Sequence, residues 1–478
     1  MSKQICRRQH TQTGAGRTQI ACNAAILLCL LAILFETCLS GSAQRPAQTP
    51  VAAATARNAA LVAATQEVLK ETSEIRELSI LRPVPSGTLS RPEIESMIVK
   101  NFDEETTPAQ SHATEVTLKK LGLVPADFQL RPFIIKLLTE QVAGYYDPKS
   151  RQFHVADWID LNGQKPVMAH ELTHALQDQH FDLLRFEHWP RGDSDAELAA
   201  HALIEGDATL TMMLYVTRDP ARLIALMKSL GGLNASSEEI DKAPRALRET
   251  LLFPYQEGLT WTQKLYKQGG WALVSKAFSD LPQSTEQILH AEKYFTHEAP
   301  VKVALPDIAP LLEAGGPGVR AHHFASHSLI AGSRSPVAVS SWRRLAYDVN
   351  GEWSLYLILD SFLKSRAESN RAAAGWGGDR YEVFEGPNGG VLLAMLTAWD
   401  TEQDAHEFFD AYVKRTQLRY KGATAVPALN SKAATPDLQT FQTSEGVVVI
   451  ELRGSRVLVV EGLPKLSDAP TLTQALWR

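Results

Sequence analysis

The sequence is poor in cysteine, and the few cysteines it has lie near its amino terminus. Cys6, Cys22, Cys29 and Cys38 all fall within the first 43 of the 478 residues. A mature chain that begins after this segment would contain none, which excludes disulfide bonds, thiolate zinc ligands and cysteine nucleophiles. Any metal site in that chain has to use nitrogen and oxygen ligands.

The chain also lacks an excess of positive charge once that segment is set aside. The chain has a formal net charge of −6, and the first 43 residues carry a net +3, which leaves −9 for the remainder. An acidic protein of this kind is a poor partner for a polyanion, so we expect no nucleic-acid binding. The glycine-rich stretch at 374–380 is not a phosphate-binding loop, because it fits neither the GxxxxGK nor the GxGxxG pattern.

A long apolar run is the third feature that the sequence lacks. Residues 21–35 are nearly all apolar, but a helix that spans a bilayer needs about 20 such residues. The run follows basic residues at 3, 7, 8 and 17 and precedes small residues at 41–43, which is typical of a cleaved export signal. We therefore predict a signal peptide at 1–43 and a secreted, periplasmic or cell-envelope protein. We expect no membrane span in the mature chain, although an uncleaved N-terminal anchor is the alternative.

The most informative pattern that is present is the HExxH run at residues 170–174. On a helix, His170 and His174 lie one turn apart on the same face, so both imidazoles can reach one metal ion. Glu171 lies about 100° further round the helix, where it can act as general base toward the attacking water. Apolar neighbours and Pro166 near the first turn indicate a buried helix. The pattern predicts a catalytic Zn²⁺ site of the zincin type.

Three residues, His180, Asp178 and Glu205, are considered for the position of third ligand. His180 gives HExxHxxQxxH, which is similar to the metzincin pattern, but Gln177 stands where that pattern needs a glycine with positive φ. If the helix continues, His180 is rotated roughly 120° away from the ligand face. Asp178 is on the right face but one turn further along, where it could orient a ligand.

Glu205 is the preferred candidate for the third ligand. It lies 31 residues after His174, in an alanine-rich helical stretch whose small residues allow close packing against the first helix. A His₂Glu site leaves a coordination position open for water. His201, one turn earlier, and Asp207 are candidates for supporting roles around the ligands.

The mature chain is long enough for two or three domains. We predict a flexible linker at 44–60, a mainly helical zincin-like catalytic domain at 61–340, a small α+β domain at 341–465 and a tail at 466–478. Residues 142–155 read as a hairpin around an Asp-Pro turn, and its strand could bind an extended peptide by backbone pairing. In residues 282–294, His290 and Tyr294 share a face if the segment is helical, and either could donate a hydrogen bond to an oxyanion.

The C-terminal region has a different pattern. We predict an amphipathic helix at 346–363, a glycine-rich turn at 374–380, a strand at 391–399, a helix at 400–412, and strands at 447–452 and 457–460. The overall fold class is therefore α+β, with a small hairpin or sheet in the helical domain and antiparallel strands in the C-terminal one.

Several of these motifs together resemble gluzincin-type metallopeptidases and, more narrowly, a largely uncharacterised group of exported bacterial proteins. The shared pieces are spread over most of the mature chain: residues 144–148 (GYYDP), the HExxH run, residues 205–208 (EGDA), residues 284–287 (STEQ) with His290 and Tyr294, and residues 375–379 (GWGGD). The chain departs from the pattern at Ala291, where proline is expected. The resemblance implies His170, His174 and Glu205 as zinc ligands and Glu171 as the base.

The prediction from sequence is an exported zinc-dependent metallopeptidase that acts on a peptide or protein substrate. One rival is a non-catalytic envelope protein that keeps a zinc-stabilised scaffold for binding, although a purely structural site has no need of Glu171. The other rival is a zinc hydrolase of a non-peptide amide, which should have a closed pocket rather than an open groove.

Overall fold

The fold is that of a computed structural model, which describes residues 50–141, 144–158, 161, 163–187, 192–223, 242–314, 342–427 and 436–478. The chain divides into two compact units whose segments alternate along the sequence. The first contains residues up to Lys100, Ile135–Leu184 and Ile204–Lys242, and the second contains Asn101–Ile134, Arg185–Leu203 and Ala243–Arg478. The predicted signal peptide, the possible anchor and all four cysteines lie outside the described residues.

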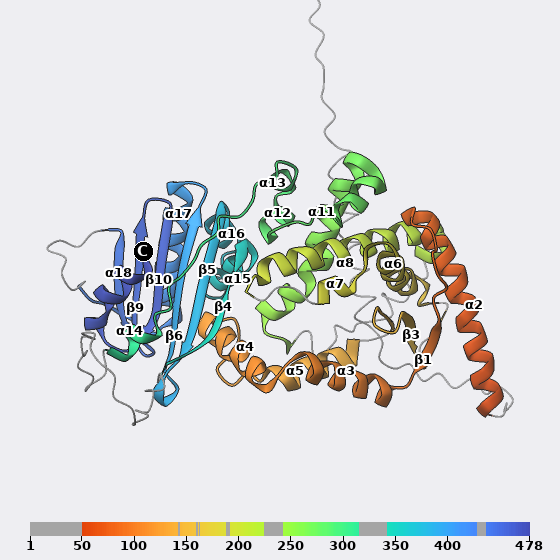
Figure 1. The fold of residues 1–478 in the computed structure, drawn as a ribbon, viewed down its shortest axis with the longest axis horizontal. Helices are drawn as coiled ribbons and strands as arrows, with labels where there is room; N and C mark the ends of the chain where they lie inside the picture. Colours follow the sequence, from red (N-terminus) through yellow and green to blue (C-terminus); the bar gives the residue numbers. More distant parts are fainter. Residues whose placement is uncertain are drawn as a thin grey trace, which may run out of the picture. The chain divides into compact units, whose positions relative to one another are not determined.

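The first unit is mainly helical and carries a small sheet (Figure 1). Its main elements are α2 (Pro50–Arg76), β1 (Ser86–Leu89), the start of α3 (Arg91–Glu105), β2 (Gly144–Asp147), β3 (Gln152–Ala156), α6 (Lys165–Phe181) and most of α8 (Ser194–Thr217). The sheet has the order β1-β3-β2, with β1 and β3 parallel and β2 and β3 antiparallel. Strand β2 is thus an edge strand of this sheet. Helix α2 packs along α6.

The second unit is built on a seven-stranded antiparallel sheet (Figure 1). Its order is β4-β5-β6-β10-β9-β8-β7, formed by β4 (Arg343–Asp348), β5 (Trp376–Glu385), β6 (Val391–Trp399), β7 (Thr424–Ala425), β8 (Leu438–Thr443), β9 (Gly446–Arg453) and β10 (Arg456–Leu463). The helices of this unit include α4 (Pro108–Leu121), α11 (Arg245–Ala277), α12 (Thr285–Leu289), α13 (Ala291–Phe295), α14 (Ala309–Ala314), α15 (Gly351–Leu363), α16 (Arg366–Ala373), α17 (Glu402–Arg419) and α18 (Ala469–Leu476). Helices α5 (Leu130–Gln141) and α7 (Leu184–Glu187), like α3 and α8, have residues in both units.

Apolar layers cover both faces of the large sheet. On one face, Val457 and Val459 pack with Phe408 of α17 and with residues of α15 and α16. On the other, Leu458 and Val460 pack with Leu472 of α18 and with the segment that leads into α14. Strands buried on both faces have continuous apolar sequences rather than alternating ones, which explains the unbroken run at 457–460. Residues 466–478, expected as a tail, therefore contribute to the core.

Most predicted elements are confirmed. The hairpin is present as β2 and β3. Helix α3 begins after Ser90, whose backbone and hydroxyl both donate to Glu93, and α4 ends at Gly122 in the left-handed conformation. Strands β6, β9 and β10 and helix α17 occupy the predicted positions. The α+β class is confirmed, with a mainly helical part, a small sheet and C-terminal antiparallel strands.

Four predictions of local structure were wrong. The described part of the predicted linker 44–60 is helical from Pro50, because its alanine-rich sequence favours helix and proline is tolerated in the first turn. Residues 346–348 belong to β4 rather than to the following helix, because β4 pairs with β5. Residues 376–380 begin strand β5 instead of forming a turn. His290 separates two short helices, so His290 and Tyr294 do not share one helical face.

The glycines at the start of β5 have a packing role. A Cβ on Gly378 would lie 2.3 Å from the carbonyl oxygen of Val301, and the Val301 amide donates to the Gly377 carbonyl at 2.6 Å. Glycine therefore permits the segment around Val301 to lie against the strand. This close approach is invisible in the sequence, where consecutive glycines indicate a turn.

Candidate metal centre

The two histidines of the HExxH run lie on helix α6, in the first unit. This helix buries most of its residues, and His170 is only 2% exposed whereas His174 is partly exposed. Their ring centroids are 4.8 Å apart, with the rings nearly perpendicular. The i, i+4 spacing has therefore placed both imidazoles on one face of the helix, as the sequence predicts.

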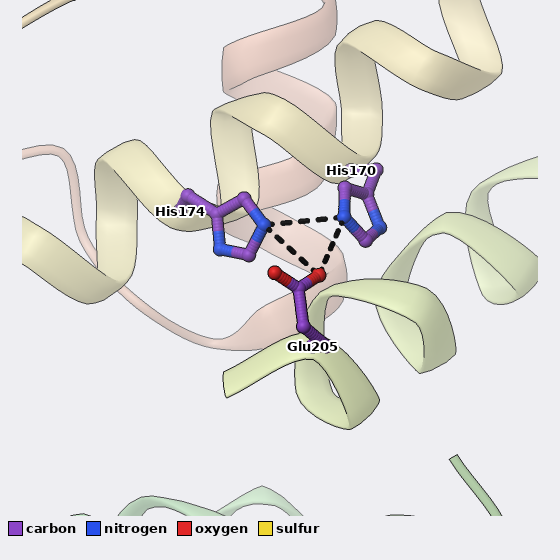
Figure 2. Close-up of side chains that lie close together, drawn as sticks. All are labelled: His170, His174 and Glu205. Atoms are coloured by element: carbon purple, nitrogen blue, oxygen red, sulfur yellow. Dashed lines mark hydrogen bonds and ion pairs between the residues drawn. The ribbon is translucent and has the colours of Figure 1, made fainter. Parts of the chain in front are cut away.

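Glu205 of α8 meets both imidazoles (Figure 2). Its Oε2 lies 3.1 Å from His170 Nε2 and 3.5 Å from His174 Nε2, and the two Nε2 atoms are 3.1 Å apart. A tetrahedral zinc ion with bonds of about 2.0–2.1 Å holds its ligand atoms roughly 3.3 Å apart. The structure thus brings together the three predicted ligands at a spacing that fits zinc.

The electrostatics of this triangle suit a cation. Burial opposes ionisation of Glu205, but the two imidazoles beside it hold the pKa of its carboxyl group below the usual range. Burial also disfavours the His174 imidazolium, yet the neighbouring Glu205 carboxylate raises the pKa of His174 to about 9. The site thus stabilises positive charge at the point where the three ligand atoms meet, and a metal ion would supply that charge.

Glu171 is held beside the triangle by the small sheet. Its Oε2 accepts a hydrogen bond from the backbone amide of Tyr146 in β2, at 3.0 Å. Burial raises the pKa of Glu171, against the opposing influence of His170 and His174. A carboxylate with a raised pKa is a better proton acceptor at neutral pH. The same contact places edge strand β2 next to this residue.

Gln177 has a role that the sequence analysis missed. Its Oε1 lies 2.8 Å from His174 Nδ1, and its amide nitrogen donates to the Asp207 carboxylate at 2.9 Å and to the Ile204 carbonyl at 3.0 Å. The amide oxygen can only accept, so it fixes the proton on His174 Nδ1 and leaves Nε2 as the metal-binding atom. The detectable signal was the i+3 spacing from His174, which puts Gln177 one turn further on the same helix.

Asp207 is itself anchored by a buried arginine. Arg76 Nε donates to Asp207 Oδ1 at 2.5 Å, and both side chains are fully buried. The chain of contacts runs from Arg76 of α2 through Asp207 of α8 to Gln177 and His174 of α6. Asp207, considered in the sequence as a possible partner of a ligand histidine, acts on His174 through Gln177.

The remaining nearby candidates have other contacts. His180 Nε2 donates to the Ser79 carbonyl at 2.8 Å, so the structure gives no support to the metzincin alternative. Asp178 accepts hydrogen bonds from Tyr146 Oη at 2.9 Å and from Arg82 at 2.5 Å. Asp178 therefore anchors the small sheet and the chain after α2, and it does not orient a ligand histidine. His201 belongs to the second unit and is exposed.

His290 and Tyr294 also belong to the second unit. His290 Nε2 lies 3.0 Å from Glu352 Oε1, and the Tyr294 hydroxyl donates to the Asp280 carbonyl at 2.8 Å. The carboxylate of Glu352 raises the pKa of His290. These contacts stabilise the segment within its own unit, and the catalytic role predicted for the two residues remains a prediction.

A second group of acidic side chains in the described residues, Glu286, Glu298 and Asp400, could also surround a cation. Lys293 already does so, because its ammonium group lies 2.7 Å from Glu286, 2.7 Å from Glu298 and 2.5 Å from Asp400. This group is therefore satisfied by the protein's own lysine.

Comparison with known proteins gives one partial match. A family model for a domain of unknown function (DUF8575) matches residues 339–473. The match covers the large sheet and its C-terminal helices and leaves out the HExxH helix and Glu205. No curated protein and no solved structure matches the chain. Among the helices of the described residues, none combines the length and the apolar character needed to cross a bilayer.

Proposed function

We propose that the protein is a zinc-dependent metallopeptidase of the gluzincin type, with His170, His174 and Glu205 as ligands. The observation that carries the proposal is the triangle of ligand atoms with edges of 3.1, 3.1 and 3.5 Å, set beside a glutamate. Two imidazoles and one carboxylate are a donor set that zinc prefers, and three protein ligands leave one position open for water. The export signal predicted from the sequence would place the enzyme outside the cytoplasm.

Bound zinc would lower the pKa of a coordinated water and polarise the scissile carbonyl. Glu171 takes a proton from the attacking water and delivers it to the leaving amine. The Tyr146 amide holds the carboxylate in position for both transfers. Gln177 keeps His174 in the tautomer that presents Nε2 to the metal.

Strand β2 supports a peptide as the substrate. It is the edge strand of the small sheet, and its Tyr146 amide contacts the proposed base. An extended peptide could pair with the backbone of such an edge and bring a scissile bond close to Glu171. A substrate that binds in this way needs a groove that is open along the strand.

The decisive experiment compares the wild-type protein with Glu171→Gln. The variant should keep one zinc ion per chain, measured by metal analysis, and lose at least about 10²-fold in hydrolysis of unfolded casein or a fluorogenic peptide library. Glu74→Gln is the matched control, because Glu74 is an exposed carboxylate on α2. The control should retain both zinc and activity.

Other outcomes separate the proposal from its rivals. Casein hydrolysis that survives in Glu171→Gln would refute the proposed mechanism. Stoichiometric zinc without any amide hydrolysis by the wild type would favour the non-catalytic scaffold. Hydrolysis of small non-peptide amides but not of peptides would favour a zinc hydrolase that acts on non-peptide amides.

A further inference from the structure

A cavity of about 670 Å³ lies within the second unit and is lined by residues of helix α4, the start of α8 and strands β4 and β5. Its volume falls in the range of small-molecule sites, which is about 300–1,000 Å³. One wall is a face of α4 that includes Thr117 and Leu121, spaced one helical turn apart. All residues that line it belong to the same unit, which does not contain the candidate zinc ligands. We call it the α4/β4 cavity.

The described residues that line this cavity carry a net negative charge. Glu197 and Asp348 line it, and none of the described residues that line it is a lysine, arginine or histidine. Asp348 accepts hydrogen bonds from Ser194 N at 2.9 Å, Ser194 Oγ at 2.5 Å and Val349 N at 2.8 Å, all from neutral groups. Burial raises the pKa of Glu197, and Asp348 adds to this effect against the influence of His201. A cation in the cavity would relieve the repulsion between the two carboxylates.

Two arginines of strands β4 and β5, Arg344 and Arg380, make contacts elsewhere. Arg380 lies over the ring of Tyr347, with 4.6 Å between the guanidinium carbon and the ring centroid, and donates to the Gly192 carbonyl. Arg344 pairs with Glu382 at 2.7 Å. Within the described part of the chain, neither arginine comes within ion-pair distance of Glu197 or Asp348.

A buried hydroxyl group adds an independent signal for a ligand. The Thr117 hydroxyl lies in the α4 wall, is buried, and has no hydrogen-bond partner among the described residues. Buried polar groups are normally hydrogen-bonded, and a ligand would satisfy this one. Tyr381 lines the opposite wall and stands directly across the strand pair from Asp348, so the two side chains lie on the same face of the sheet.

From these observations we infer that the α4/β4 cavity binds a small ligand with a primary ammonium group on a short apolar stem. The ammonium donates to Glu197 and Asp348. The hydroxyls of Tyr381 and Thr117 accept or donate beside it. The stem lies against apolar residues such as Leu121. The group could come from a free amine or from a lysine side chain of a peptide. The inference is independent of the zinc proposal.

Calorimetric titration of the full-length protein tests the inference with three probes. The probe 1,5-diaminopentane represents a free amine, N-acetyl-lysine N-methylamide represents a peptide lysine, and hexanoate is an anion of similar length. At least one ammonium probe should bind with one-to-one stoichiometry, and hexanoate should not. Saturation by the diamine alone would identify a free amine as the ligand, and saturation by the lysine derivative would identify a peptide side chain. If neither ammonium probe saturates, or if hexanoate binds equally well, the inference is overturned.

Variants then locate the binding. Glu197→Gln should weaken binding of the diamine or lysine probe about tenfold or more, the loss expected for a charge-assisted hydrogen bond. Tyr381→Phe should weaken it less. Glu402→Gln, which changes an exposed carboxylate on α17 of the same unit, is the matched control and should leave binding unchanged. An equal loss in the control would show non-specific attraction and refute the site.

A stability measurement separates binding from a structural role. Because burial and Asp348 already disfavour the Glu197 carboxylate, Glu197→Gln should leave the melting temperature unchanged or raise it. A strongly destabilised variant would mean that Glu197 is structural, and this result would count against the inference. Peptidase activity is not needed for any of these readouts, so the zinc proposal can fail without affecting them.

Discussion

At the scale of single residues, the metal centre depends on contacts made behind the ligand atoms. His174 receives its orientation from Gln177, and Gln177 is fixed in turn by Asp207 and Arg76. Gln177, Asp207 and Arg76 are fully buried. Partners of this kind set the tautomer and the ring position of a ligand histidine. Metal affinity should therefore be sensitive to a residue that never touches the metal.

Replacing Gln177 with leucine tests this dependence. The substitution keeps the side-chain size but removes the three hydrogen bonds of the amide, to His174, Asp207 and Ile204. Zinc affinity should therefore fall roughly 10–100-fold, measured by competition with a chelator. Gln179→Leu is the control, since Gln179 binds the backbone of Leu81 and Arg82 instead of a histidine. It should lower stability and leave zinc affinity unchanged. Equal zinc affinity in Gln177→Leu and wild type would contradict the role given to Gln177.

At the scale of elements, close backbone approaches decide where helices can lie. Helix α11 reaches α8 at Gly258, where an added Cβ would be 2.2 Å from the carbonyl oxygen of Ala202. Backbone atoms cannot move aside as a flexible side chain can. The alanine-rich start of α8 therefore serves contact with α11, in addition to carrying Glu205 toward α6.

Gly258→Ala should destabilise the protein by roughly 1–3 kcal/mol, because the extra methyl group forces the two helices apart. Thermal or denaturant unfolding would measure the change. Gly87→Ala in β1 is the control, since the nearest atom to an added Cβ there is 4.0 Å away. If the two variants unfold alike, the close contact between α8 and α11 is not as tight as described.

Helix α17 and strand β10 are joined by a buried ionic cluster around Glu461. Its carboxylate pairs with Arg415 and accepts from Tyr412 at 2.6 Å and Tyr420 at 2.8 Å. Burial opposes ionisation of Glu461, but Arg415 and Arg419 outweigh it and lower the pKa of this carboxyl group to about 2. The cluster thus stabilises the fold only while Glu461 is ionised.

Acid should weaken this unit in a defined pH window. The folded-state pKa is below the unfolded value of about 4.3, so the contribution is complete above that pH and is lost as pH falls toward 2. At pH 7, Glu461→Gln should cost about 3–5 kcal/mol, because it leaves Arg415 buried without its partner. The difference in unfolding free energy between wild type and variant should shrink as the pH falls from about 5 to about 2.5, because the folded and unfolded pKa values of Glu461 set this window. A difference independent of pH would refute the assignment.

At the scale of the whole molecule, the candidate zinc site and the large sheet belong to different units. All three predicted ligands lie in the first unit, whereas the match to a domain of unknown function covers the sheet of the second. Binding that occurs only in the folded state stabilises the part of the chain that contains the site. Zinc should thus act on the two units unequally.

Hydrogen exchange with and without zinc tests this expectation. Zinc should slow exchange in peptides from α6, β2 and the part of α8 that carries Glu205, and should leave β6, β9 and β10 unchanged. Magnesium is the control ion, because it prefers all-oxygen octahedral sites and should slow neither region. Protection by zinc in the large sheet alone would place the metal elsewhere.

The sequence by itself determined the features that depend on local spacing. It placed His170, Glu171 and His174 on one helix, selected Glu205 over His180, and predicted the β2–β3 hairpin and the C-terminal strands, because helical and strand periods are set by the nearest residues. Tertiary structure alone decided the rest. The anchoring of Gln177 by Asp207 and Arg76 comes from other helices, and the glycines at 377–378 became part of a strand because another segment lies against them. Such roles arise from contacts between residues far apart in the chain, which no local pattern encodes.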